Sequence, residues 1–328
     1  MTIERKNWGN TKDGGICLYT ISNGVMSLSM TNYGCTITDI IIANRNIIAG
    51  YSTFEELEQD PFYMGSLVGR YAGRIKDACF TLNGAAYKLS PNDGNTGHHL
   101  HGGERGFNSM VFKEVSSHST STFAALTFSG VSNHLDEGYP GKVDLTVTIT
   151  LNTDNEIIFS YYARTNQPTH LNLTHHLYYN LNGREKPSAQ SLRINAAQMV
   201  ETTEDYIPTG RIIEIPEASN FAVRKEIPPD AAFNECYVVN QSKKMRTVAE
   251  LTDRNSSLKM EVATTCPGLI FYSGQFLSAP FAPRQAICLE TQYYPDSPHH
   301  PGFPSTLYDA HSIFNEYTKL SFHKTDLK

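Results

Sequence analysis

Two adjacent histidines, His175 and His176, lie in the apolar segment NLTHHLYYNL (residues 172–181). Histidine ionises near neutral pH and serves as a general acid or base. Neighbouring residues on an extended strand point to opposite faces, so only one of the two imidazoles can enter a given pocket. The alternative to chemistry is one buried, hydrogen-bonded histidine and one exposed histidine. These residues alone do not decide between the two.

A glutamate in an apolar segment is the second candidate for proton transfer. Glu290 follows Ile287, Cys288 and Leu289 in ICLETQ (287–292). Burial of a carboxylate is costly, and apolar surroundings raise its pKa. Glu290 is therefore a candidate general base. The alternative is a glutamate at the end of a strand that faces solvent.

Two further polar segments contain groups that suit hydrogen bonding to a small molecule. GRYAGRI (69–75) contains Arg70 and Arg74, whose guanidinium groups fit sugar hydroxyls or anions. In FNECYVVN, Asn234 and Glu235 precede an apolar strand. Ordinary surface charges explain each segment equally simply when it is taken alone.

The segment HHLHGG (98–103) contains three histidines and two glycines. The glycines after His101 let the backbone turn tightly or approach a ligand closely. His98, His99 and His101 superficially resemble a metal-ligand set. However, His99 and His101 can share a strand face that His98 cannot, and no nearby carboxylate completes a site. We therefore expect no metal here.

The elements that must position these side chains are mostly strands. In LTVTITLNTDNEIIFSYYAR (145–164), apolar and polar residues alternate on both sides of a turn, which predicts a β-hairpin. One short helix is expected at 52–59, where Thr53 and Glu56 form a capping box. Other short strands are predicted at 35–42, 123–130 and 285–294. The pattern favours an all-β fold: one large antiparallel β-sandwich with few short helices, as a single domain over 1–328.

The composition is that of a globular protein. The chain has 328 residues, 40% hydrophobic and 18% charged, with a net charge of −6, which disfavours nucleic acid or an anionic membrane as the partner. Its six cysteines form no CxxC pair, so free thiols in a reducing compartment are expected. The first residues contain no apolar leader, and no segment approaches the length of a membrane span. We expect a cytoplasmic protein.

Five segments, taken in order along the chain, resemble those of the aldose 1-epimerase (galactose mutarotase) family. They are MTNYGCTITDI (30–40), GRYAGRIKDACFTLNGAAYKLSPNDGNTGHHLHGG (69–103), HLNLTHHLYYNLNG (170–183), CPGLIFYSGQFL (266–277) and ICLETQYYPDSPHHPGFP (287–304). The second segment is the most diagnostic. The resemblance covers the whole chain and implies a supersandwich fold and a cofactor-free activity that interconverts the α and β anomers of hexoses.

The resemblance also implies roles for individual residues. Glu290 corresponds to the general base and His176 to the general acid, while His101 and Arg74 bind and orient the sugar. His175 takes the position of an asparagine, and alternation sends it to the opposite face of the strand. Both catalytic groups must act as acid and base by turns, because the ring opens and then closes from the other side.

Aromatic rings suit the C–H faces of a sugar, and planar amides suit its hydroxyls. Tyr71, Tyr178 and Phe271 lie in the matching segments and are candidates for ring contacts, with a plain core role as the alternative. Asn234 and Gln275 are candidates for hydrogen bonds to the substrate.

The sequence departs from the family pattern at three places, one of which is the pair Asn234–Glu235. Gly73 stands where the family often has asparagine, and Ile270 stands where it often has glutamine. Asn234 and Glu235 replace an aspartate followed by a histidine. In the family these positions shape sugar binding rather than proton transfer, so the departures bear on the preference for galactose.

Three other functions remain open at this point. An epimerase acting on a phosphorylated or uronic sugar is compatible with Arg70 and Arg74. A non-catalytic carbohydrate-binding protein would use the same scaffold without the chemistry. A glycoside hydrolase needs two carboxylates, and only Glu235 is available as the second. In each case the partner is a small-molecule sugar, and the chain is expected to be a monomer or homodimer.

Overall fold

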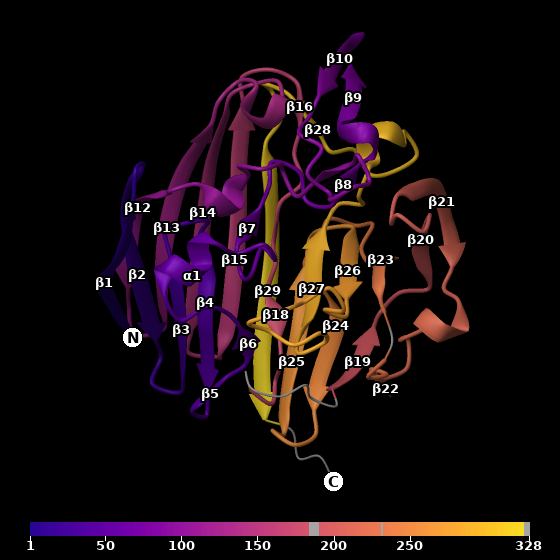
Figure 1. Ribbon diagram of the computed structural model, residues 1–328. Helices are drawn as coiled ribbons and strands as arrows, with labels where there is room; N and C mark the ends of the chain where they lie inside the picture. The colour runs from indigo at the N-terminus through magenta and orange to yellow at the C-terminus, as the bar shows by residue number, and fades with distance from the viewer. Residues whose placement is uncertain (184–189, 231, 325–328) are drawn as a thin grey trace.

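The computed structural model describes residues 1–183, 190–230 and 232–324, and strands make up nearly all of their regular structure (Figure 1). A nine-stranded antiparallel sheet has the order β12 (Lys113–Ser119), β13 (Phe123–Ser132), β14 (Val143–Asn152), β15 (Glu156–Thr165), β29 (Phe314–Lys324), β25 (Leu258–Thr264), β24 (Arg246–Asp253), β19 (Gln190–Ile194) and β22 (Lys225–Glu226). A seven-stranded sheet has the order β21 (Pro208–Glu214), β20 (Gln198–Thr202), β23 (Asn234–Val238), β26 (Gly268–Tyr272), β27 (Ile287–Gln292), β18 (Tyr178–Tyr179) and β6 (Ile48–Ala49).

Smaller sheets complete the fold. The N-terminal sheet has the order β1 (Thr2–Thr11), β2 (Gly14–Ser22), β3 (Met26–Thr31), β4 (Ile37–Ile42) and β5 (Arg45–Asn46). Four strand pairs lie nearer the site, namely β7 (Leu67–Val68) with β17 (Thr174–His175), β8 (Arg74–Ile75) with β11 (His99–Leu100), β9 (Cys79–Leu82) with β10 (Ala85–Lys88), and β16 (Thr169–His170) with β28 (Leu307–Tyr308). Residues of β26 and β27 share one apolar cluster with residues of β24 and β25, so the seven-stranded and nine-stranded sheets pack together as layers of a sandwich; Figure 1 labels these four strands.

The predicted hairpin forms as the alternation requires. Strands β14 and β15 pair from Val143 with Thr165 to Leu151 with Ile157. Every second residue of β14 is buried, and the residues between them are partly or fully exposed. One face of the hairpin therefore contributes to the large apolar core, as expected for a sheet with one buried face. The other strands predicted at 35–42, 123–130 and 285–294 are also present, with ends that differ by up to two residues.

The predicted helix and its cap are confirmed. Helix α1 (Phe54–Glu58) begins after Thr53, whose hydroxyl accepts a hydrogen bond from the Glu56 amide. The Glu56 carboxylate accepts one in return from the Thr53 amide, which completes the capping box. No helix within the described residues is long and apolar enough to cross a membrane. All six cysteines are free thiols, and four of them are buried.

Alternate residues of the seven-stranded sheet belong to two different apolar clusters. In β27, Ile287 and Leu289 lie in the large core that this sheet shares with the nine-stranded sheet, whereas Cys288 lies in a smaller cluster. In β18, Tyr179 lies in the large core and Tyr178 in the smaller cluster. The sheet therefore has one face fixed against the sandwich core and a second face on which a site can form.

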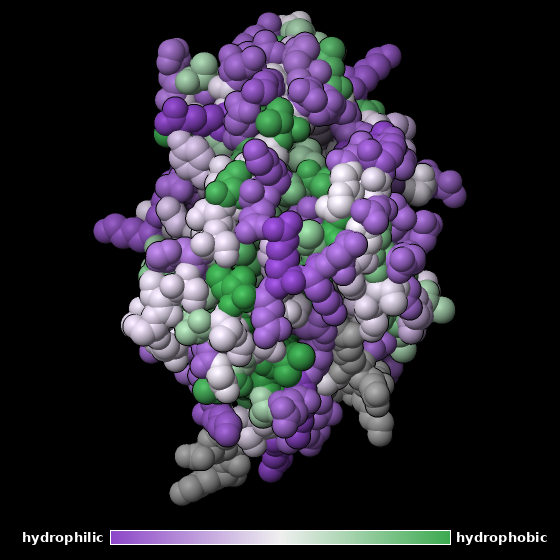
Figure 2. Space-filling model, turned by 90° about the vertical axis from the view of Figure 1, so that its left-hand side faces the viewer, coloured by the Kyte–Doolittle hydropathy of each residue, from purple (hydrophilic) through white to green (hydrophobic). Residues whose placement is uncertain are grey.

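One side face of the molecule is mainly hydrophilic. Figure 2 shows the left-hand side of Figure 1, where apolar side chains form small, separate patches among polar ones. Scattered apolar residues of this kind are normal for a protein surface and do not mark a docking area.

Candidate active site

The second face of strand β27 lines a cavity of about 440 Å³. Glu290 and Gln292 point into this cavity, whereas Leu289 lies in the large core and Thr291 bonds Thr318 of the nine-stranded sheet. Glu290 is 3% exposed. Its Oε2 atom and Oε1 of Gln292 have no hydrogen-bond partner among the described residues. Because buried polar atoms are normally paired, these two atoms mark a place for a polar ligand.

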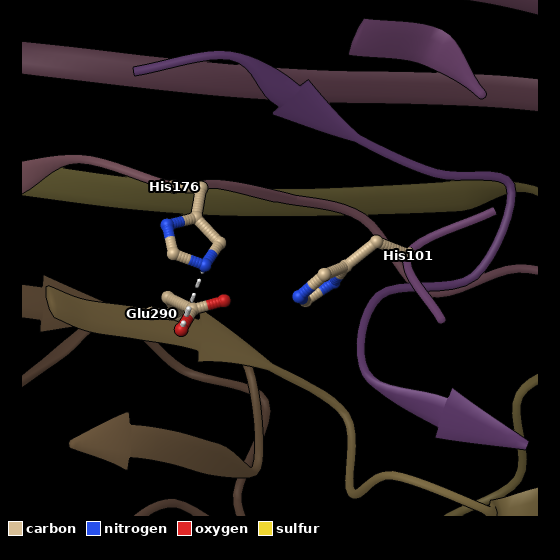
Figure 3. A group of neighbouring side chains, drawn as sticks. All are labelled: His101, His176 and Glu290. Carbon is tan, nitrogen blue, oxygen red and sulfur yellow. Dashed lines mark ion pairs between the residues drawn. The ribbon is translucent and has the colours of Figure 1, made fainter. Parts of the chain in front are cut away.

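The two adjacent histidines point to opposite sides of the strand, and His176 is the one that enters the cavity. His176 points toward Glu290, and its Nε2 lies 3.7 Å from the carboxylate Oε1 (Figure 3). The ring of His175 is held on the other side, where Nε2–H donates to the Cys35 carbonyl at 3.1 Å and Nδ1 accepts from the Tyr161 hydroxyl at 2.8 Å. His175 therefore has a structural role, as the alternation along the strand indicates.

His101 approaches the same space from a separate turn (Figure 3). It follows β11, which pairs with β8 through Leu100 and Arg74, and it has a left-handed φ of 54°. The Gly73 amide donates to Nδ1 of His101 at 3.2 Å. In a neutral imidazole only one nitrogen carries a proton, so the proton is on Nε2. His101 thus presents an N–H donor to the cavity.

Burial shifts the ionisation of all three groups. It raises the pKa of Glu290 to about 8, while the cation of Arg74 partly opposes the shift. Burial lowers the pKa of His176 to about 4 and holds the pKa of His101 well below its usual range. At neutral pH the resting site therefore has two neutral imidazoles and a largely protonated carboxyl group.

Arg74 brings a positive charge to the cavity wall. Its guanidinium makes two contacts with Asp93, from Nε to Oδ2 at 2.7 Å and from Nη2 to Oδ1 at 3.2 Å. It also lies 5.2 Å from the centre of the Tyr206 ring, in the range of a cation–π contact. Arg74 is therefore held in one orientation beside the cavity.

Aromatic rings form much of the remaining wall. The Tyr63 ring centre is 4.7 Å from that of His101 and 6.3 Å from that of His176. Tyr178 stacks on His176 at 4.9 Å, and the Tyr272 ring lies 6.4 Å away at a steep angle. These rings fix the histidines in place and offer faces for the C–H groups of a ligand.

The cavity includes some of the predicted substrate-binding residues and excludes another. Asn234 begins β23 and lines the cavity, together with Tyr178. Gln275 does not line it, because its side-chain oxygen turns away to accept a hydrogen bond from the Ser273 hydroxyl at 2.7 Å. The next residue, Phe276, lines the cavity instead and is 58% exposed.

Two charged residues considered from the sequence serve the fold rather than the cavity. The buried guanidinium of Arg70 donates to the carbonyls of Pro140 at 2.8 Å and Gly141 at 2.9 Å. Glu235 lies on the opposite side of β23 from the cavity-lining residues, where the Ser219 hydroxyl donates to it at 3.4 Å. Arg70 therefore supplies no second cation to the cavity, and Glu235 supplies no second carboxylate.

Two of the aromatic candidates also lie in the core. Phe271 belongs to the large apolar cluster, since it alternates with the cavity-lining residues Ile270 and Tyr272. Tyr71 is fully buried, and its hydroxyl donates to the Tyr294 carbonyl at 3.0 Å. Of the three rings predicted to contact a sugar, only Tyr178 faces the cavity.

The other histidines of the segment 98–103 do not join His101 around a common point. His99 is fully buried, with its ring between the Ser90 carbonyl at 2.8 Å and the Tyr139 hydroxyl at 2.7 Å. His98 accepts a hydrogen bond from the Asp77 amide at 3.1 Å. Both rings therefore stabilise the fold.

A different trio has spacing that a metal ion could use. Ligand atoms of His101, His176 and Glu290 lie within 4.8 Å of one another. However, the hydrogen bond from the Gly73 amide to Nδ1 leaves the proton of His101 on Nε2, the nitrogen that a cation would need. The arrangement suits a ligand that offers oxygen lone pairs and hydroxyl protons.

Sequence reasoning missed several residues that line the cavity: Tyr63, Asp93, Tyr206 and Gln292. Gln292 follows Glu290 by two residues on the same strand, so alternation could have identified it. The other three come from loops, and nothing in their local sequence marks them.

The cavity thus holds a buried carboxyl group and a histidine that face each other, with hydrogen-bond donors around them. This arrangement is typical of an enzyme that moves protons on a small polar molecule. Comparisons with known proteins agree with this class. The family model for aldose 1-epimerase matches residues 17–321. A galactose mutarotase from Sus scrofa is 30% identical over 98% of this chain and 99% of its own length. An aldose 1-epimerase from Escherichia coli K12 is 28% identical over 86% of this chain and 87% of its own length.

The chain therefore belongs to the aldose 1-epimerase family, and its activity is that of an isomerase, a mutarotase. Solved structures agree on the fold. A galactose 1-epimerase from Lactobacillus acidophilus superposes with a TM-score of 0.88 at 20% identity, with 99% of both chains covered. A GalM/aldose epimerase homologue from Caenorhabditis elegans gives 0.87 at 24% identity, covering 94% of this chain and 99% of its own. The predicted family and β-sandwich fold are confirmed.

Proposed function

We propose that this aldose 1-epimerase interconverts the α and β anomers of free, neutral hexoses such as galactose and glucose, with Glu290 and His176 as the catalytic pair. The observation that carries the assignment is their geometry. Both side chains are buried, their Nε2 and Oε1 atoms lie 3.7 Å apart, and Oε2 of Glu290 is left without a partner among the described residues. One group can meet the anomeric hydroxyl while the other meets the ring oxygen.

The two groups share one proton over most of the physiological pH range. Burial pushes the pKa of Glu290 up to about 8 and that of His176 down to about 4, so between these values the pair holds a single proton. A sugar hydroxyl that donates to Oε2, together with the Arg74 cation, favours the carboxylate form of Glu290. The proton then resides on His176, and the complex contains a base and an acid.

The reaction follows from this arrangement. Glu290 removes the proton of the C1 hydroxyl, His176 protonates the ring oxygen, and the C1–O5 bond breaks to give the open-chain aldehyde. After rotation about the C1–C2 bond, the ring oxygen attacks the other face of the aldehyde. His176 takes back the proton of that oxygen, and Glu290 returns its proton to O1. Each positioned acid or base group typically contributes about 10²–10⁴ in rate.

The remaining residues bind the sugar. The N–H of His101 and the guanidinium of Arg74 donate to its oxygens, and Asn234 offers an uncharged amide at the cavity wall. Tyr178 supports the His176 ring and supplies an apolar face. We further propose that residues 1–328 act as one domain and that the enzyme works in the cytoplasm, for which the free thiols are the support.

The charges around the cavity favour a neutral sugar over a phosphorylated or uronic one. Arg74 is already paired with Asp93, and Arg70 is committed to backbone carbonyls. Glu204 and Asp205 line the cavity as well. An anionic substrate would therefore meet more carboxylates than free cations, which costs energy on binding.

Polarimetry on freshly dissolved α-D-galactose and α-D-glucose tests the proposal, with wild type beside Glu290→Gln. We expect rapid mutarotation by the wild type and a loss of at least about 10²-fold in the variant, whose folding is checked by circular dichroism. The 6-phosphates of both sugars should react more slowly. Full activity in Glu290→Gln would refute the catalytic assignment, and faster turnover of the phosphates would refute the neutral substrate.

A further inference from the structure

Asp93 lies outside the catalytic pair but contacts the one guanidinium that lines the cavity among the described residues. Its two oxygens meet Nε and Nη2 of Arg74 at 2.7 and 3.2 Å. The Asp93 side chain is 12% exposed and that of Arg74 is 17% exposed. A two-point contact of this kind fixes the plane of the guanidinium as well as its position, which a single contact does not.

Asp93 is itself held by its own loop. Oδ2 accepts a hydrogen bond from the Thr96 hydroxyl at 3.1 Å, and the Asp93 amide donates to the His98 carbonyl at 3.2 Å. The Tyr206 ring lies 5.2 Å from the Arg74 guanidinium. Arg74 is therefore fixed by two separate parts of the chain, and Asp93 provides the charged contact.

The charge of Arg74 matters because, among the described residues, it is the permanent cation that lines the same cavity as Glu290. Tyr63, Asp93, Glu204, Asp205 and Tyr206 line the same cavity as Glu290. Within the described residues, the ionisable side chains that face Glu290 directly or interact with it are His176, His101, Arg74, Cys236, Cys288, Tyr178, Tyr179 and Tyr272. The imidazoles are neutral because burial lowers their pKa, and burial raises the pKa of each thiol and phenol. Arg74 is the group in this set that carries a charge at neutral pH, and it favours the carboxylate form of Glu290.

We propose that Asp93 is a positioning residue that holds the Arg74 guanidinium in place and balances its charge, and that it thereby sets how strongly Glu290 retains its proton. This inference rests on the proposed function, because the retained proton is the one that the catalytic pair exchanges. Without the Asp93 carboxylate, the full field of Arg74 would act on Glu290. Glu290 would then lose its proton at a lower pH.

The test compares the pH dependence of kcat/KM for wild type, Asp93→Asn, Arg74→Gln and the double variant. Asp93→Asn removes the charge but keeps the shape and an acceptor oxygen. We expect its alkaline limb to move down by about one pH unit, a tenfold change in the ionisation constant. Arg74→Gln leaves the negative charge of Asp93 without its partner and should move the alkaline limb to higher pH. In the double variant the limb should return close to that of wild type.

Two variants serve as controls. Asp93→Glu keeps the charge and should restore the alkaline limb even where KM rises. Asp205→Asn removes the same charge from an exposed residue of the cavity wall, where water screens it, and should move the limb by less than a third as much. Equal losses of activity at every pH in Asp93→Asn, with the limb unmoved, would overturn the proposal. Shifts of the same sign in both single variants would overturn it as well.

A second readout separates this inference from the proposed function. Titration of the Glu290 carboxyl carbon by NMR in ¹³C-glutamate-labelled protein follows ionisation without any turnover, with Glu290→Gln to assign the signal. Opposite shifts in Asp93→Asn and Arg74→Gln would support the inference even if the wild type accelerated no mutarotation. Active wild type with an unmoved Glu290 titration in both variants would refute the inference and leave the proposed function standing.

Discussion

The buried carboxyl group of Glu290 is expected to lower the free energy of unfolding above about pH 5. The variant Glu290→Gln, which lacks the ionisable group, tests this directly. Glutamine has nearly the same shape and carries no charge at any pH. In the folded protein, burial raises the pKa of Glu290 from 4.5 to about 8. A group with a raised pKa contributes stability that is fully present below the unfolded pKa and is lost as the pH rises through the folded value.

The size of the effect follows from the interval between the two pKa values. One pKa unit corresponds to about 1.4 kcal/mol, so the interval from 4.5 to about 8 corresponds to about 5 kcal/mol in the free energy of unfolding. Relative to wild type, Glu290→Gln should gain about 3 kcal/mol between pH 5 and pH 7 and continue to gain up to about pH 8. The same substitution removes the proposed general base, so activity is lost while stability rises.

Urea unfolding at pH 5, 6, 7, 8 and 9, followed by far-UV circular dichroism, measures the difference between the two proteins. Glu235→Gln is the matched control, because burial raises the pKa of Glu235 to about 7 on the other side of its strand. Its gain in stability should be smaller and level off near pH 7, with mutarotation retained. A difference between wild type and Glu290→Gln that stays constant from pH 5 to 9 would refute the reasoning.

Three further outcomes are expected. A plot of kcat/KM against pH should be bell-shaped. It should fall tenfold per pH unit below about pH 4, where His176 gains a proton, and above about pH 8, where Glu290 loses one. A profile with a single limb would contradict the shared proton. His175→Phe should lower the unfolding free energy by about 1–3 kcal/mol, because the Tyr161 hydroxyl and a carbonyl lose their partner, yet should keep kcat/KM within about threefold in polarimetric assays. Arg70→Met should lower the free energy of unfolding by more than about 3 kcal/mol and therefore lower the melting temperature, because it leaves several buried carbonyls unpaired. An unchanged melting temperature in calorimetry would contradict that role.

Much of the fold and part of the candidate site could be predicted from the sequence because strands alternate. Alternation sends His175 and His176 to opposite faces and does the same for Leu289 and Glu290, and the structure has both arrangements. The same rule, applied one step further, would have placed Gln292 in the cavity and Phe271 in the core. Gln292 was overlooked, and Phe271 was kept as a candidate beside its core alternative, because residues were judged by their motif rather than by their alternation along the strand.

Other parts of the site depend on contacts that no local pattern records. Arg70 and Arg74 lie four residues apart and look alike in the sequence, yet one is buried against distant carbonyls and the other lines the cavity. Asp93 lies in a turn-rich segment, where an aspartate usually signals a turn, and its role depends on reaching Arg74 across 19 positions. Gln275 is the opposite case, because a hydrogen bond from Ser273, two residues away in the sequence, takes its side-chain oxygen out of the cavity.

The chemistry of the site requires a sheet that has one face packed in a large apolar core. The pKa values of the two proposed catalytic groups are shifted from their values in water, and both shifts arise from burial. Such a site destabilises the fold, so the strand that carries it needs compensating contacts nearby. Strand β27 provides them on its other face, where Ile287 and Leu289 lie in the large apolar core. A solvent-facing sheet edge would offer neither the burial that shifts Glu290 nor the core that offsets its cost.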